Sequence, residues 1–336
     1  MVKQHDEAPP DAVVVVGASA GGVEALRTLV RDLDGGVGAP VLVVLHVPPG
    51  ESALPNILAR AGALPVAHAR DREALVNDRV YVAPPDRHLL VEDGHVRVVR
   101  GPQENGHRPA IDPLFRSAAV SYRNRAVAVV LSGALDDGAA GAVAVSRHGG
   151  TVIVQDPDDA SCPSMPKHAI AANHPEFVVA LATMAAALKK GVERVRTVPL
   201  EEPRQDQDAH EVEVAEFEFD TEVRTRLGEE SAYSCPTCGG VLREAPEDML
   251  RFRCRVGHAF GANSLLEAQS ETVDGALWMA LRALQERSEL SGRLIERMRQ
   301  RGNERSVARH EQRRDEAERA AATLRELLLG RDAEPG

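Results

Sequence analysis

Ser19, His46 and Asp137 are residues of the types that form a serine hydrolase triad, and each follows an apolar run that is typical of a buried strand. In such a triad the histidine accepts the proton of the serine hydroxyl, while the aspartate orients the histidine and stabilises its cationic form. Open α/β sheets carry their functional residues at the carboxyl ends of their strands. The three residues therefore predict an acyl-transfer site at that edge of a sheet.

Ser19 lies within Gly17–Gly22, a run of small residues that permits a sharp turn from a strand into a helix and exposes the serine hydroxyl. A glycine-rich turn at this place is also where nucleotide-binding folds hold pyrophosphate. In those folds the middle position of the motif is glycine and the second strand ends in an acidic residue, but here the two positions hold Ser19 and His46. The sequence thus favours a nucleophile turn over a nucleotide site.

His46 and Asp137 each have a simpler structural interpretation. A histidine after a strand is often a satisfied structural residue, and Asp137 could instead cap a helix that begins at Gly138. Asp136 is the nearest competitor for the carboxylate, so the residues alone leave the choice between Asp136 and Asp137 open. The order Ser…His…Asp also differs from the Ser…Asp/Glu…His order of α/β-hydrolases, which disfavours a lipase-type enzyme although G-x-S-x-G is present.

Short β-branched runs alternate with stretches of helical periodicity from residue 13 to residue 190. The runs predict buried parallel strands with helices between them. The strands are Val13–Val16, Val41–Leu45, Val127–Leu131 and Thr151–Gln155, and the helices are Gly22–Leu33, Ser52–Ala61, Asp112–Arg123 and Gly138–His148. Leu89–Glu92 and Val96–Arg100 flank a hairpin turn. We therefore expect an α/β fold, with a doubly wound, mostly parallel sheet and an antiparallel hairpin.

Cys235, Cys238, Cys254 and His258 have the spacing C-x₂-C, 15 intervening residues, and C-x₃-H. Four soft ligands with no open position predict a structural Zn²⁺ site, which disfavours a catalytic zinc and leaves a set of metal-free thiols as the alternative. We expect about one zinc per chain. Because a polar stretch precedes the site, loss of the metal is expected to unfold this part of the chain but to spare most of the hydrolase activity.

The chain divides by composition into a catalytic domain over residues 10–192, an acidic linker over 193–230, a zinc-knuckle module over 231–262, called the Cys/His module below, and an α-helical hairpin over 263–330. The linker holds 13 acidic and 5 basic residues, a composition typical of a solvated segment. A docking segment is the alternative, through the apolar residues Val212, Val214, Phe217 and Phe219. Apolar stripes over 265–299 and 303–329 predict the two helices of the hairpin, which could also support self-association.

Composition excludes several classes of protein. Hydrophobic residues make up 43% of the chain, but no apolar run approaches the roughly 18 residues of a membrane span. The first ten residues are polar and lack the apolar stretch of a signal peptide, so we expect a cytoplasmic protein. No part of the chain is basic enough to predict nucleic acid as a partner, and the net charge is −11.

Several blocks of this sequence resemble the signature blocks of the CheB-type protein-glutamate methylesterases. The three main blocks are Gly17–Gly22, His46–Gly50 and Leu131–Gly141, and further matches are Val82–His88, Arg108–Phe115 and Met165–Lys167. Together they span about residues 12–190. The resemblance implies Ser19 as the nucleophile, His46 as the general base and Asp137, rather than Asp136, as its orienting partner.

The resemblance also implies the reaction. Such enzymes hydrolyse methyl esters of glutamate side chains on chemotaxis receptors, release methanol and deamidate certain receptor glutamines, without a metal or organic cofactor in catalysis. The oxyanion would be held by the backbone amides of Ala20 and Ala134, where Ala134 stands in place of the methionine that is usual in the family. The implied partner of this chain is therefore a methyl-accepting receptor or a similar methylated protein.

The chain departs from the family pattern in other places. The segment 160–165 is shorter than the usual loop. Cys162 lies near His168 in the sequence, which raises a thiol nucleophile as an alternative, but the sequence favours a small buried or loop cysteine. Only residues 1–12 precede the first predicted strand, so we expect no N-terminal receiver domain in this chain. Two other functions stay open: an esterase or amidase with a different substrate, and a non-catalytic signalling module that acts through its C-terminal half.

Overall fold

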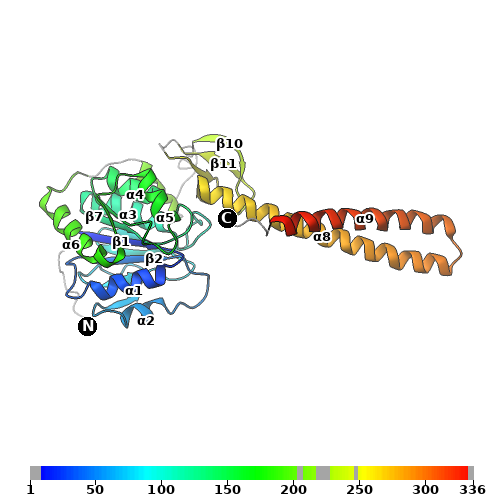
Figure 1. Cartoon of the computed structure of the whole chain (residues 1–336). Coiled ribbons are helices and arrows are strands. Elements are labelled where there is room, and N and C mark those ends of the chain that lie inside the picture. The colour runs from blue at the N-terminus through cyan, green and yellow to red at the C-terminus, as the bar shows by residue number, and fades with distance from the viewer. Residues whose placement is uncertain (1–8, 203–206, 217–227, 246–248, 332–336) are drawn as a thin grey trace, which may run out of the picture. The chain divides into compact units, whose positions relative to one another are not determined.

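The computed structural model describes residues 9–202, 207–216, 228–245 and 249–331, which belong to two compact units, Met1–Leu265 and Leu266–Gly336 (Figure 1). The first unit contains the predicted catalytic domain and the Cys/His module, and the second contains most of the helical hairpin. Within the described ranges, no helix is both long and apolar enough to cross a membrane.

A seven-stranded sheet forms the centre of the first unit, in the order β3-β4-β2-β1-β7-β8-β9, and every pair of neighbours is parallel. Its strands are β1 (Val13–Ala18), β2 (Val41–Leu45), β3 (Val66–His68), β4 (Val80–Val82), β7 (Ala126–Val130), β8 (Thr151–Gln155) and β9 (Phe177–Val179). The predicted hairpin is a separate two-stranded antiparallel sheet of β5 (His88–Glu92) and β6 (His95–Val99). The predicted fold class is confirmed.

Helices cover both faces of the sheet (Figure 1). One group is α1 (Gly22–Asp32), α2 (Leu54–Ala59) and α6 (Leu181–Thr197), and the other is α3 (Ile111–Tyr122), α4 (Ala139–Arg147) and α5 (Ser164–Ala172), with a short 3₁₀ turn at Arg123–Arg125. Alternate strand residues serve the two layers, since Val14 packs with the first group and Val15 with the second. Burial on both faces explains why the strands are almost entirely apolar.

Part of the predicted acidic linker is helical and packed. Helix α7 (Gln207–Glu216) contacts α3, and Val214 and the carboxylate of Glu211 are buried. This differs from the predicted solvated segment, because guanidinium groups distant in the sequence offset the cost of burying the acidic side chains. Residues 203–206 and 217–227, which include Phe217 and Phe219, lie outside the described residues. The division of the chain at residues 192, 230 and 262 stays a prediction.

The Cys/His module contains a four-stranded antiparallel sheet in sequence order. Its strands are β10 (Glu229–Ser234), β11 (Val241–Glu244), β12 (Arg251–Cys254) and β13 (Ala259–Gly261). The sheet continues directly into helix α8 (Ala262–Gln300). The first residues of α8, up to Leu265, belong to the first unit.

The second unit pairs the remainder of α8 with α9 (Glu304–Arg331) through a turn that includes Gly302, whose φ is 70°. Its small apolar core consists of Leu281, Ala321 and Leu328, with Leu277, Leu284 and Leu324 packed against it. These residues belong to the stripes that the sequence predicts for the hairpin. An ion pair of 2.5 Å between Arg299 and Glu311 also joins the two helices.

Candidate active site

Ser19 occupies the turn between β1 and α1. Its amide donates a hydrogen bond of 2.9 Å to the carbonyl of Ser132, and its carbonyl accepts one of 2.8 Å from Gly22. Gly21 makes the turn possible, because its φ is 74° and a Cβ there would lie 2.8 Å from Ser132 Oγ and from Ser161 Cβ. The turn therefore holds the Ser19 side chain at the carboxyl end of the central strand.

The structure brings Ser19, His46 and Asp137 together. His46 Nδ1 lies 3.0 Å from Ser19 Oγ, and His46 Nε2 lies 2.7 Å from Asp137 Oδ2. A carboxylate only accepts, so Nε2 carries the proton that it donates to Asp137, and Nδ1 is free to accept the hydroxyl proton of Ser19. The side chains of His46 and Asp137 are 7% and 1% exposed, which shields this pair from water.

Asp137 is surrounded by donors. Besides His46, its carboxylate accepts hydrogen bonds from the amides of Ile111 (2.7 Å) and Asp112 (3.1 Å) at the start of α3 and from Asn105 Nδ2 (2.9 Å). Burial by itself would raise the pKa of Asp137, but the hydrogen bond and charge of His46 and the Ile111 amide hold it well below its usual value. Asp137 is therefore ionised wherever the histidine functions as a base.

Asp112 is a second buried carboxyl group beside Asp137. It shares Asn105 Nδ2 with Asp137, at 3.0 Å, and accepts hydrogen bonds from the amides of Gly138 and Gly141 at the start of α4. Burial and the neighbouring charge of Asp137 raise the pKa of Asp112 to about 7. Since two adjacent buried carboxyls resist ionising together, Asp137 ionises first and Asp112 only at higher pH.

Asp136 faces away from the histidine, toward the start of α8. Its carboxylate accepts hydrogen bonds from the amides of Asn263 (3.1 Å) and Ser264 (3.2 Å), and from the hydroxyl of Ser264. These amides belong to the first turn of α8, where helices lack internal partners for their N–H groups. Of the two candidates left open by the residues alone, the one beside His46 is thus Asp137.

His107 stacks on His46, with ring centroids 3.7 Å apart and planes 17° from parallel. Burial, and then the neighbouring imidazole of His46, lower the pKa of His107 to about 4. It is therefore neutral near pH 7 and can pack flat on His46 without repelling a protonated His46 ring. The sequence analysis missed both His107 and Asn105, although they lie only a few residues before the Arg108–Phe115 block.

The oxyanion is predicted to lie near the backbone amides of Ala20 and Ala134. Among the described residues, neither amide donates a hydrogen bond, whereas that of the intervening-loop residue Gly133 is bound to the carbonyl of Cys162 at 3.0 Å. Gly133 also packs against Ser19, because a Cβ there would lie 2.9 Å from Ser19 Cβ. The loop after β7 therefore approaches Ser19 closely. A backbone amide that binds the oxyanion of a substrate at Ser19 must lie at such a short distance.

Cys162 is not paired with a free base. The nearby His168 donates from Nδ1 to the carbonyl of Leu135 at 2.8 Å, and its Nε2 accepts from Asn263 Nδ2 at 3.0 Å. Both ring nitrogens are thus engaged in hydrogen bonds, and Nδ1 holds the loop that carries Ala134. The thiol-nucleophile alternative has no support in this arrangement.

The first unit also has clefts away from Ser19 and His46. One of about 500 Å³ lies beside Tyr122 and Arg125, at the amino ends of the strands, and one of about 430 Å³ lies beside His168 and Arg251. Neither is lined by Ser19 or by His46. The first cleft lies at the end of the strands opposite to Ser19, and the second, beside Asp136, is lined by no residue of the candidate triad.

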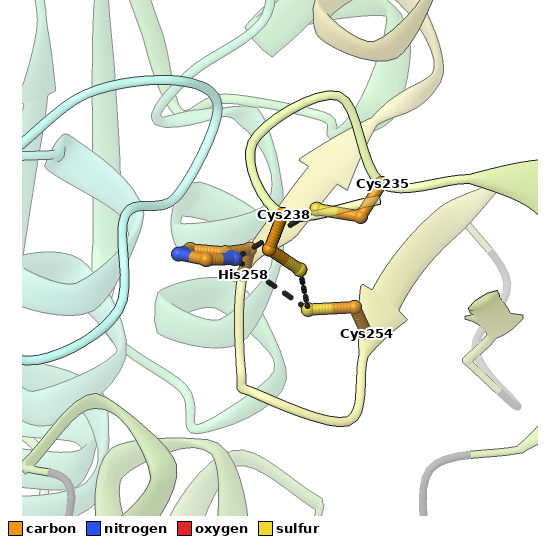
Figure 2. A group of neighbouring side chains, drawn as sticks. All are labelled: Cys235, Cys238, Cys254 and His258. Carbon is orange, nitrogen blue, oxygen red and sulfur yellow. Dashed lines mark hydrogen bonds between the residues drawn. The ribbon is translucent and has the colours of Figure 1, made fainter. Parts of the chain in front are cut away.

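Cys235, Cys238, Cys254 and His258 converge in the Cys/His module, with one ligand atom from each within 4.8 Å of the others (Figure 2). Cys238 Sγ and Cys254 Sγ are 3.7 Å apart, and His258 Nδ1 lies 3.7 Å from Cys235 Sγ and 3.6 Å from Cys254 Sγ. A tetrahedron with Zn–S of about 2.3 Å and Zn–N of about 2.0 Å has S···S edges of roughly 3.8 Å and S···N edges of roughly 3.5 Å. The four residues therefore fit zinc.

The local backbone and charge also suit a metal. Cys235 accepts a hydrogen bond of 2.8 Å from the amide of Gly239, whose φ is 73°, and donates one of 2.7 Å to Gly240, which forms a tight knuckle. A hydrogen bond from Cys235 lowers the pKa of the Cys254 thiol to about 3, and the same bond raises that of Cys235. The positive charge of a bound cation would favour the thiolate form of the cysteines.

The sequence profile described as CheB methylesterase matches residues 14–188, which is more than half of the chain. The chain belongs to the CheB methylesterase family. A Leptospira interrogans protein is 35% identical over 174 residues, which are 51% of this chain and 90% of that protein. The protein-glutamate methylesterase/protein-glutamine glutaminase of Geobacillus kaustophilus is 38% identical over 186 residues, 54% of this chain and 53% of that protein.

The fold agrees with this membership. The crystal structure of the Thermotoga maritima CheB methylesterase catalytic domain, 33% identical, superposes with a TM-score of 0.51 over 53% of this chain and 97% of that one. This chain spans about half the length of the Geobacillus protein. The CheB methylesterase domain here contains Ser19, His46 and Asp137, whereas the four candidate metal ligands lie outside the matched residues.

Proposed function

We propose that this chain hydrolyses methyl esters of glutamate side chains on a chemoreceptor-type protein, with Ser19 as the nucleophile. The observation that carries the proposal is the hydrogen-bonded series Asp137–His46–Ser19 at the carboxyl end of a CheB methylesterase sheet. The name of the Geobacillus relative, protein-glutamate methylesterase/protein-glutamine glutaminase, supports the substrate and suggests glutamine deamidation at the same site. We place the protein in the cytoplasm, because thiols stay reduced there and all four cysteines are free.

The geometry suits an acyl-enzyme mechanism. Ser19 Oγ attacks the ester carbonyl as His46 Nδ1 takes its proton, and Asp137 stabilises the imidazolium through Nε2. The amides of Ala20 and Ala134 would hold the negative carbonyl oxygen. The carbon–oxygen bond of the ester then breaks, and methanol leaves with the proton from His46. His46 next takes a proton from water, whose oxygen attacks the acyl group, and the glutamate is released as Ser19 recovers its proton.

The substrate is tested with a methylated chemoreceptor fragment. Incubation of the full chain with the fragment should release methanol and lower the mass of each hydrolysed glutamate by 14 Da, the mass of one CH₂ group, as roughly one methyl group per turnover is lost. The same fragment without methylation is the control and should release none. If a serine-reactive fluorophosphonate labels Ser19 while methanol is not released, the enzyme acts on another ester or amide, and the chemoreceptor substrate is wrong.

We further infer that Cys235, Cys238, Cys254 and His258 hold a structural Zn²⁺. Support comes from the tetrahedral distances between the four ligand atoms and from the absence of an open position among them. Bound zinc would fix the ends of β12 and β13, since Cys254 ends the first strand and His258 directly precedes the second. The metal would serve structure only, because the triad needs no metal.

Metal analysis of the purified chain should find about one zinc per chain, and Cys235→Ser should lose it. The matched control is Cys162→Ser, which lies outside the cluster and should keep the zinc. The apparent free energy of zinc binding at such a site is roughly 10–16 kcal/mol near pH 7. Acidification should release the metal, because protons compete for the thiolates and the imidazole. Metal-free wild-type protein that does not take up added Zn²⁺ would contradict the inference.

A further inference from the structure

Residues 259–264, which directly follow the candidate ligand His258, contact two loops: one whose side chains contact Asp137 and His46, and one that contains Asp137. They comprise strand β13 and the first residues of α8, and they lie within the first unit. The first of these loops is 103–107, between β6 and α3, and the second is 133–137, after β7. The sequence analysis instead expected the module to be independent of the hydrolase.

Loop 103–107 pairs with β13 by its backbone. Asn105 N donates to the carbonyl of Ala259 at 2.7 Å, and Ala259 N donates to Gln103 at 3.2 Å. The amide of Gly261 donates to Asn105 Oδ1 at 2.8 Å, while Nδ2 of the same side chain donates to Asp137 Oδ1 at 2.9 Å. One buried amide side chain thus connects the module to the catalytic aspartate.

The same loop also contacts the general base. A tight turn with mutual backbone hydrogen bonds between Glu104 and His107, of 3.2 and 2.8 Å, fixes the position of His107 relative to Asn105. His107 stacks on His46 at 3.7 Å between ring centroids. A shift of the loop would therefore move the contacts of both His46 and Asp137.

A buried cluster of charges anchors the loop on the module. Glu104 is paired with Arg116 of α3 at 2.6 Å and with Arg251 and Arg253 of β12, each at 3.3 Å. Glu211 of α7 pairs with the same two module arginines at 2.9 and 2.8 Å. All of these side chains are at most 4% exposed, so separating β12 from the loop would leave charges buried without partners, which is strongly unfavourable.

The second loop is held by the start of α8. Asp136 accepts hydrogen bonds from the amides of Asn263 and Ser264. The side chain of Asn263 donates to His168, which in turn donates to the carbonyl of Leu135. Leu135 has a φ of 60°, a conformation that a residue with a branched side chain keeps only where its surroundings enforce it.

We propose that the metal-filled Cys/His module is a positioning element of the active site, and that Asn105 is the positioning residue through which it orients Asp137 and His46. The proposal rests on the proposed function for the triad and for the metal. Zinc holds Cys254 and His258 together and thereby fixes the direction in which β13 leaves His258. The positions of loops 103–107 and 133–137 depend in turn on their contacts with β13 and the start of α8. Loss of the metal then lowers turnover, because a misplacement of about 1 Å can cost 10²-fold in rate.

The test uses the full chain in three states: as purified with zinc, stripped with a chelator, and reloaded with Zn²⁺. The rate of fluorophosphonate labelling of Ser19 and the kcat for a methylated fragment are measured in each state. Stripping should lower both by roughly 10²-fold with little change in KM, and reloading should restore them. A stripped chain that labels as fast as the loaded one overturns the proposal.

Asn105→Ala separates positioning from loss of folding, because it leaves all four ligands in place. This variant should keep one zinc per chain and the KM of the wild type, but should lower the labelling rate and kcat by roughly 10- to 10²-fold. The matched control is Asn173→Ala. Asn173 lies in the same unit and donates a hydrogen bond to Ser146, and among the described residues it has no hydrogen bond to a residue of the triad. Wild-type labelling by a zinc-loaded Asn105→Ala variant overturns the proposal.

The labelling assay also distinguishes this proposal from the proposed substrate. A loaded wild-type chain that reacts at Ser19 but releases no methanol contradicts the methyl-ester substrate alone. In that case, the dependence of the labelling rate on zinc and on Asn105 still decides whether the module positions the triad.

Discussion

Ser19→Ala is expected to lower kcat by roughly 10⁶, because no other hydroxyl is hydrogen-bonded to His46 among the described residues. The substitution removes only the Ser19 hydroxyl oxygen from a turn whose shape is set by Gly21, so the fold should not change. Methanol release from a methylated receptor fragment measures the loss. A fluorophosphonate probe should label the wild-type chain and leave Ser19→Ala unlabelled.

Ser121→Ala provides the matched control. Ser121 lies near the end of α3, and its hydroxyl donates to the carbonyl of Val91. It should be dispensable for turnover. The thermal midpoint of both variants should show that neither substitution unfolds the chain. If Ser19→Ala kept more than a small fraction of the wild-type kcat, another residue would be the nucleophile.

Asp137→Asn is expected to lower kcat by roughly 10⁴, since an amide can donate to His46 and so favours the wrong tautomer of the imidazole. The native carboxylate accepts from His46 Nε2 and from the amides of Ile111 and Asp112. An asparagine NH₂ group cannot accept those bonds, so the thermal midpoint should also fall. Turnover must therefore be compared at a temperature at which the variant is fully folded.

Asp136→Asn is the neighbouring control with the same change of side chain. Its carboxylate faces the amides of Asn263 and Ser264 and not His46, so the loss should be no more than about tenfold, or about 1.4 kcal/mol in the barrier. A larger loss for Asp136→Asn than for Asp137→Asn would show that Asp136 is the orienting carboxylate. The triad assignment to Asp137 would then be wrong.

Local sequence determined the framework of the catalytic domain. The β-branched runs of Val13–Val16 and Val41–Leu45 predicted buried parallel strands, and these are central strands of the sheet. This succeeded because a strand buried on both faces must be apolar at every position, a pattern that is legible without knowledge of its neighbours. The small residues around Ser19 and the spacing of the cysteines are likewise local, since a tight turn and a metal knuckle form within a few residues.

Only the tertiary structure decided which residues support those sites. Glu211 lies in a segment whose composition is typical of a solvated linker, yet its carboxylate is buried against Arg251 and Arg253, about forty positions away along the chain. Asn105 and His107 carry no local pattern, because what distinguishes them is contact with Asp137 and His46. Pairing of charges and hydrogen-bonding groups between distant segments is a property of the packed chain. The sequence alone could therefore single out Ser19, His46 and Asp137 as candidates, but not the contacts of the Cys/His module with loops 103–107 and 133–137.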